Sequence, residues 1–182
     1  GALEEISPVL FLALRFSIAA IALGFLYVRR HGGSIRGRPW LGGIATGLFL
    51  FTGYVLQTIG LRYTTPAKSG FITGFYIVLV PFFGAIVYRN VPQLSDLIGV
   101  AAATVGLVLL TWTGDAFRMS TGDLLTVGCA VAFAFHILML GHYTSRTDYE
   151  WLALLQIGTS AVAALAMFRV IGSAAMPCTT LN

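Results

Sequence analysis

Six apolar runs, each close to the length of a membrane-spanning helix, follow one another along this chain. They cover residues 8–28, 40–60, 67–87, 94–112, 124–141 and 151–171. A helix needs about 20 apolar residues to cross a hydrocarbon layer of about 30 Å. Only 10% of the residues are charged, against about 25% in a typical soluble domain. The sequence therefore predicts an all-α, polytopic transmembrane helix bundle of about six spans.

Positive charge is distributed unevenly over the short loops between these runs. The loops on one side of the membrane hold Arg29, Arg30, Arg36, Arg38, Arg89 and Arg146, and those on the other side hold Arg62, Lys68 and Arg118. Cytoplasmic loops are the ones enriched in lysine and arginine. We therefore predict a multi-pass protein of the inner (plasma) membrane with residues 29–39 in the cytoplasm. Arginines in so short a hairpin are typical of topology determinants, so no nucleic-acid partner is predicted.

Several polar side chains interrupt the apolar runs, where they are costly unless they face the protein interior or water. Tyr54, Gln57 and Thr58 share one face of the second run, because residues three and four apart are neighbours on a helix. This stripe fits either a cavity wall that binds a substrate or hydrogen bonding between helices. The candidate cavity-lining residues are Tyr54, Gln57, Thr73, Tyr76 and His136.

Two ionisable residues within the runs have further interpretations. His136 could relay protons, since imidazole titrates near physiological pH. No Asp or Glu lies within the core of any run, however, so a hydrogen-bonded interior histidine is favoured. Arg15 lies about two turns into the first run, where it can reach the interface or a carbonyl group, and we expect a structural role.

The hairpin from Gly60 to Lys68 precedes a segment rich in small residues. Pro66 fits the first turn of the next helix, where its missing N–H costs nothing. Small residues let helices approach closely in lipid. We expect close packing at Ser69, Gly70, Thr73 and Gly74, at Gly43 and Gly47, at Gly99 and Gly106, and along Ala130, Ala132 and Ala134.

Signatures of catalysis and metal binding are absent from the sequence. It contains no HExxH, no GxSxG and no pair of intramembrane aspartates. Its two cysteines, Cys129 and Cys178, form no CxxC pair. We predict no enzyme activity, no catalytic residue, no metal site and no cofactor.

The order of several segments resembles a known family of transporters. The stretch GLRYTTPAKSGFITGFYIVLVPFFGAIVYR, followed by PQLSDLIGVAAATVGLVLLTW, resembles helices three to five of a repeat in the EamA family of the drug/metabolite transporter superfamily. ISPVLFLALRFSIAAIAL resembles helix two of that repeat, with Arg15 at the family's usual arginine. GDLLTVGCAVAFAFHILMLGHYTSR and YEWLALLQIGTSAVAAL resemble the first two helices of the second repeat. The chain departs from the family at Tyr88 to Pro92, where members often have a glutamate.

The resemblance implies part of a ten-helix transporter fold built from two inverted five-helix repeats. Residues 1–113 would be a first repeat without its first helix, residues 122–171 the start of the second repeat, and 172–182 an irregular tail, so the chain is expected to be a fragment. The implied function is alternating-access transport, with export expected, of small organic metabolites such as amino acids or drug-like compounds. Lipid and a small-molecule substrate are the expected partners, and a homodimer is left open. The alternatives are a non-transporting membrane scaffold or assembly subunit, and an inactive fragment.

Overall fold

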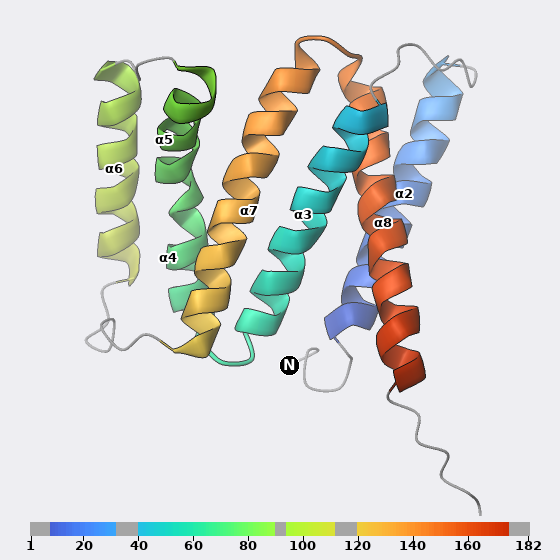
Figure 1. The fold of residues 1–182 in the computed structure, drawn as a ribbon, viewed down its shortest axis with the longest axis horizontal. Helices are drawn as coiled ribbons and strands as arrows, with labels where there is room; N and C mark the ends of the chain where they lie inside the picture. Colours follow the sequence, from blue (N-terminus) through green and yellow to red (C-terminus); the bar gives the residue numbers. More distant parts are fainter. Residues whose placement is uncertain (1–7, 32–39, 90–93, 112–119, 175–182) are drawn as a thin grey trace, which may run out of the picture. The chain divides into compact units, whose positions relative to one another are not determined.

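The computed structural model describes residues 8–31, 40–89, 94–111 and 120–174, and these ranges are helical apart from short turns (Figure 1). The helices are α2 (Pro8–His31), α3 (Trp40–Gly60), α4 (Pro66–Gly74), α5 (Tyr76–Tyr88), α6 (Leu94–Thr111), α7 (Thr121–Thr144) and α8 (Tyr149–Ala174). No strand occurs in the described ranges. The predicted all-α class is confirmed.

Five stretches of the described chain are long and apolar enough to cross a membrane. They are Val9–Arg30, Trp40–Gly60, Pro66–Tyr88, Thr121–Thr144 and Tyr149–Val170. The remaining predicted run corresponds to the 18-residue helix α6, in which Leu97–Gly106 forms a shorter apolar stretch. These helices confirm the predicted polytopic membrane protein.

The chain divides into two compact units by its internal contacts. Unit 1 comprises residues 1–51 and 146–182, and therefore holds α2, the first half of α3 and α8. Unit 2 comprises residues 52–145, with the second half of α3 and helices α4 to α7. The predicted repeat boundaries at residues 113 and 122 divide the chain differently, and they stay a prediction.

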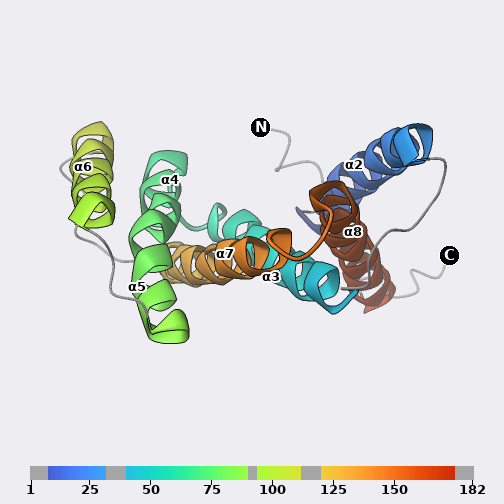
Figure 2. The ribbon, with the colours of Figure 1, turned by 90° about the horizontal axis from the view of Figure 1, so that it is seen from above.

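In unit 1, helix α8 packs against both other helices. It lies beside α2 (Figure 2), and its backbone comes close to α3 at the predicted glycines. A Cβ atom on Gly43 would lie 2.3 Å from Cβ of Leu155, and one on Gly47 would lie 2.6 Å from the carbonyl oxygen of Gln156. Ser160 Oγ donates a hydrogen bond of 2.9 Å to the Gly47 carbonyl. Close packing at Gly43 and Gly47 is thus confirmed.

In unit 2, helices α4 and α5 lie between α6 and α7 (Figure 2). Helix α7 buries the three alanines that were expected to pack closely, Ala130, Ala132 and Ala134. The prediction was wrong for three glycines, because a Cβ atom on Gly70, Gly99 or Gly106 would meet no described atom within 4 Å. These three lie on open surfaces of α4 and α6, where spacing alone does not create a helix contact.

Candidate functional site

The turn from α3 to α4 is built from local capping interactions. Helix α3 ends at Gly60, and Thr65 caps α4 with an extended backbone (φ −82°, ψ 149°). The Thr65 hydroxyl accepts a hydrogen bond of 3.3 Å from the Lys68 N–H. Pro66 begins the helix, as expected, because the first helical N–H has no partner within a helix.

The next span is interrupted at Phe75. The sequence predicted one continuous run over residues 67–87, but the structure has two helices, α4 and α5, that meet at this residue. The Phe75 N–H donates to the Ile72 carbonyl at 3.2 Å, which tightens the turn directly after Gly74, a residue of low helix propensity. At 1.5 Å per residue, Phe75 lies about 14 Å from the start of α4, close to the middle of a layer of about 30 Å.

Polar side chains from three helices meet beside this interruption. Gln57 Nε2 on α3 donates a hydrogen bond of 3.1 Å to Thr73 Oγ1 on α4. Thr73 also lies close to the buried thiol of Cys129 on α7. Thr58, in contrast, donates to the Tyr54 carbonyl of its own helix at 2.6 Å. The polar stripe predicted on the second run is therefore split between a contact with other helices and a bond within α3.

An aromatic group adjoins these polar contacts. The Phe133 ring on α7 packs edge to face against Tyr54, at 5.3 Å between ring centroids, and against Tyr76, at 6.2 Å. Gly53 makes room for it, since a Cβ atom there would lie 2.5 Å from Phe133 Cε1. We refer to Tyr54, Gln57, Thr73, Tyr76, Cys129 and Phe133 as the central cluster. Sequence reasoning missed Phe133 because an apolar ring inside an apolar helix gives no signal.

Four of the five predicted cavity-lining residues are thus brought together by contacts in unit 2. The fifth, His136, lies on α7 about one turn after Phe133 and is buried, with 9% of its surface exposed. Its place in the site stays a prediction. Two hollows in unit 2, of about 450 and 260 Å³, are lined by residues outside the central cluster.

The predicted topology arginines have different environments. Arg15 lies within α2, and Arg29 is exposed near the end of that helix. Arg30 forms an ion pair of 2.8 Å with Glu150 at the start of α8, although 67% of the Arg30 side chain is exposed. Arg36 and Arg38 lie outside the described residues.

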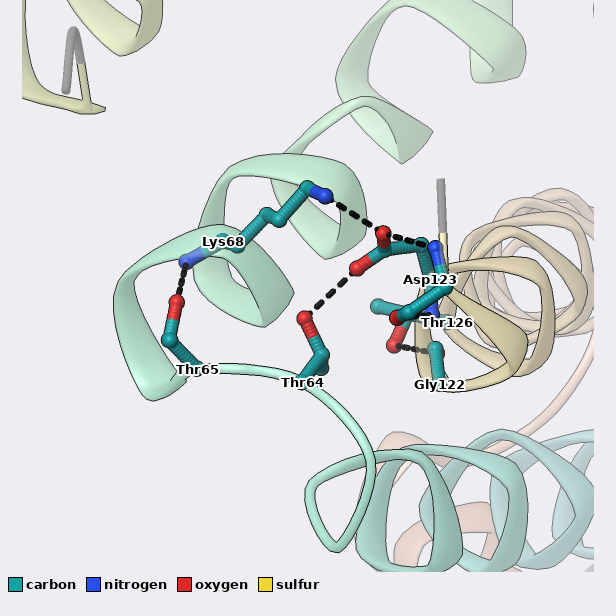
Figure 3. A network of polar contacts seen from close by, with 7 residues as sticks. Thr64, Thr65, Lys68, Gly122, Asp123 and Thr126 are labelled. Atoms are coloured by element: carbon teal, nitrogen blue, oxygen red, sulfur yellow. Dashed lines mark hydrogen bonds and ion pairs between the residues drawn. The ribbon is translucent and has the colours of Figure 1, made fainter. Parts of the chain in front are cut away.

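A buried carboxylate, Asp123, lies in unit 2 at the start of α7 (Figure 3). Asp123 is 0% exposed, and Lys68 Nζ lies 2.6 Å from its Oδ2. The Thr64 hydroxyl donates to Oδ1 at 2.5 Å, and the Ser120 N–H donates to Oδ2 at 2.7 Å. The Ser120 hydroxyl accepts from the Asp123 N–H at 3.2 Å, which completes a capping box. Both carboxylate oxygens therefore have donors.

Two glycines let the α3–α4 turn approach the start of α7. A Cβ atom on Gly122 would lie 2.5 Å from the Gly60 carbonyl oxygen and 2.9 Å from the Thr64 nitrogen. We call the contact of residues 60–68 with residues 120–126 the turn junction. Sequence analysis missed Asp123 because it lies one residue before the predicted apolar run. A serine three residues before an aspartate at the start of such a run is the signal that could have found it.

Comparison with known proteins agrees with this architecture. The sequence profile described as "EamA-like transporter family" matches residues 1–112. An uncharacterized transporter of Archaeoglobus fulgidus is 36% identical over 156 residues, which cover 85% of this chain and 47% of that protein. The uncharacterized transporter YvbV of Bacillus subtilis is 27% identical over 164 residues, covering 89% and 54%. A solved crystal structure matches with a TM-score of 0.72 at 21% identity, over 96% of this chain and 60% of that one, and shows the same fold.

The helices and the profile match together define a polytopic membrane protein of transporter type. The chain belongs to the EamA-like transporter family, as its segments suggested. It spans about half the length of the curated relatives that it matches.

Proposed function

We propose that the central cluster forms part of the substrate path of a carrier for small organic metabolites, such as amino acids or drug-like compounds. The observation that carries this proposal is the Gln57–Thr73 hydrogen bond between α3 and α4, which lies beside the tightened turn at Phe75. Polar side chains inside membrane spans are costly, and in transporters they mark substrate pathways.

The chemistry of the central cluster supports an uncharged or amphipathic ligand. Gln57 and Thr73 offer amide and hydroxyl groups, and Tyr54, Tyr76 and Phe133 offer aromatic faces. Ligand sites commonly combine apolar walls with a few hydrogen-bonding groups that fix orientation. A metabolite with an apolar body and a polar head would exchange its contacts for the existing Gln57–Thr73 bond.

We further propose that this carrier works by alternating access and exports its substrate across the inner membrane. The excess of arginine in residues 29–39 supports a cytoplasmic position for that loop. Contacts made by small residues support relative motion of the helices, because glycine and alanine surfaces interlock little. In unit 2 such contacts occur at Gly53 and at the buried alanines of α7.

Matched threonine variants test the proposal in the full-length protein. Thr73→Ala removes the partner of Gln57, whereas Thr104→Ala on α6 removes only a bond of 2.7 Å to its own helix at Val100. Losing a hydrogen bond costs about 0.5–1.5 kcal/mol, so Thr73→Ala and Gln57→Leu should each slow transport about 2- to 10-fold. Tyr76→Ala removes an aromatic face, which is worth about 0.5–1.5 kcal/mol, so it should slow transport by a similar factor.

The measurement is uptake by everted membrane vesicles of a panel of radiolabelled amino acids and of the dye ethidium, at equal protein abundance. The Thr104→Ala control should keep the unaltered rate. Unchanged uptake, export and binding in both the Gln57 and Tyr76 variants would refute the assigned role of the cluster.

A second candidate is a membrane scaffold or assembly subunit, including a homodimer. One observation favours it: Gln57 already has a partner within the chain, as interhelical hydrogen bonding requires. A scaffold needs no water at this depth, so an impermeant thiol reagent should reach a Gln57→Cys variant poorly from either side of the membrane. Reaction that changes side when a transported amino acid is added would support the carrier.

A further inference from the structure

We propose that the Lys68–Asp123 ion pair is the extracytoplasmic gate of unit 2, closed in this conformation. The inference rests on the proposed transport function and adds a moving part to it. The pair closes the turn junction, where the end of α3, the start of α4 and the start of α7 come together (Figure 3). These same three helices carry Gln57, Thr73 and Cys129 of the central cluster.

The ion pair lies on the route from the central cluster to one membrane surface. At 1.5 Å per residue, Thr73 lies about 7 Å deeper along α4 than Lys68, and Phe133 lies about 15 Å deeper along α7 than Asp123. A ligand leaving the cluster toward this end has to part helices that the turn junction holds together. The proposed cytoplasmic position of residues 29–39 places this end on the extracytoplasmic side.

The junction has the properties of an element with two discrete states. Asp123 is fully buried and the Lys68 side chain is 23% exposed, so Lys68 supplies the positive charge that this buried carboxylate needs beside its donors Thr64 and Ser120. Water entering between α4 and α7 would solvate both charges and weaken the electrostatic attraction between them. The pair therefore favours either a dry, closed junction or a hydrated, open one.

Two further features of the turn junction support a gate. The contact at Gly122 is made by backbone atoms of Gly60 and Thr64, so these two segments lie about as close together as their backbones allow. Ser69, the residue after Lys68, is 1% exposed, and its hydroxyl oxygen has no hydrogen-bond partner among the described residues. Buried polar atoms are almost always paired, and opening of the junction would give this hydroxyl a water partner.

Thiol labelling tests the gate without a transported substrate. The reporter is Gln57→Cys in full-length protein that also carries Cys129→Ala and Cys178→Ser. Right-side-out vesicles expose it to an impermeant methanethiosulfonate reagent from the extracytoplasmic side, and everted vesicles from the cytoplasmic side. Mass spectrometry of the peptide holding residue 57 gives the rate.

Lys68→Met and Asp123→Asn should each raise the extracytoplasmic labelling rate about tenfold or more, because the closed state loses its ion pair. Arg30→Met is the matched control: it removes the exposed pair with Glu150 and should leave the rate unchanged. If both variants are folded and label at the unaltered rate, the junction is a static clamp and the gate is refuted.

An engineered disulfide tests the gate if the single variants do not fold. Thr64→Cys with Asp123→Cys replaces a hydrogen-bonded pair by a covalent link across the junction. Oxidation should abolish extracytoplasmic labelling of residue 57, and reduction should restore it. Extracytoplasmic labelling that oxidation does not change would overturn the gate alone, whereas absence of labelling from both sides in every variant would overturn the carrier proposal with it.

Discussion

Replacing Gly47 by alanine should force helices α3 and α8 of unit 1 apart. The added methyl carbon would lie 2.6 Å from the Gln156 carbonyl oxygen and 2.7 Å from Cβ of Thr159. Nonbonded carbon atoms pack at about 3.5–4.0 Å, so the two helices have to move apart by about 1 Å. Two of the three nearest atoms belong to the backbone of Gln156, so a change of side-chain rotamer does not relieve the clash.

Three contributions set the size of the effect. Overpacking a tight contact costs about 1–3 kcal/mol. Lengthening the Ser160–Gly47 hydrogen bond costs about 0.6 kcal/mol, the average for such bonds between membrane helices. Alanine recovers up to about 1 kcal/mol through its higher helix propensity. Gly47→Ala should therefore lower the free energy of unfolding by about 0.6–2.6 kcal/mol.

Gly158→Ala on α8 is the control, because a methyl group there meets no described atom within 4 Å. Reversible unfolding in mixed detergent and SDS micelles, followed by tryptophan fluorescence, measures the free energy. Trp40 and Trp151 report on this unit directly, since their rings pack edge to face at 5.3 Å. If the two alanine variants agree within about 0.5 kcal/mol, the range of a surface substitution, the assigned α3–α8 contact is refuted.

Further substitutions test the other contacts. Gly53→Ala should displace the phenylalanine ring between the two tyrosines and slow transport by at least about threefold, whereas Gly70→Ala, with open space around it, should leave the vesicle assay unchanged. Arg30→Gln should change the free energy of unfolding by less than about 1 kcal/mol, because the pair with Glu150 is largely exposed; a larger loss would indicate a burial that the structure lacks. Thr65→Ala should destabilise the start of α4 by about 1 kcal/mol, seen as faster amide hydrogen exchange over residues 66–70; unchanged exchange would contradict the cap.

Much of the fold follows from hydrophobic length and local capping. Runs of about 20 apolar residues can satisfy their backbone in lipid only as helices, and Pro66 and Gly60 mark the turn between two of them. The grouping of Tyr54, Gln57, Thr73 and Tyr76 could also be predicted, since polar groups in an apolar helix need a partner. The interruption at Phe75 could not, because a single tightened turn leaves the apolar pattern unchanged.

The sequence alone determined the class of protein, the approximate helix ends and the polar residues that lie inside the membrane spans. The tertiary structure decided which partners those residues meet. Gly47 and Gly106 are both glycines with another glycine one or two helical turns before them, yet one touches a helix backbone and the other has no described atom within 4 Å of an added Cβ atom. Asp123 is buried against Lys68 although 54 residues lie between them along the chain. Such contacts depend on which helices become neighbours, and hydrophobic periodicity specifies a face without specifying its partner.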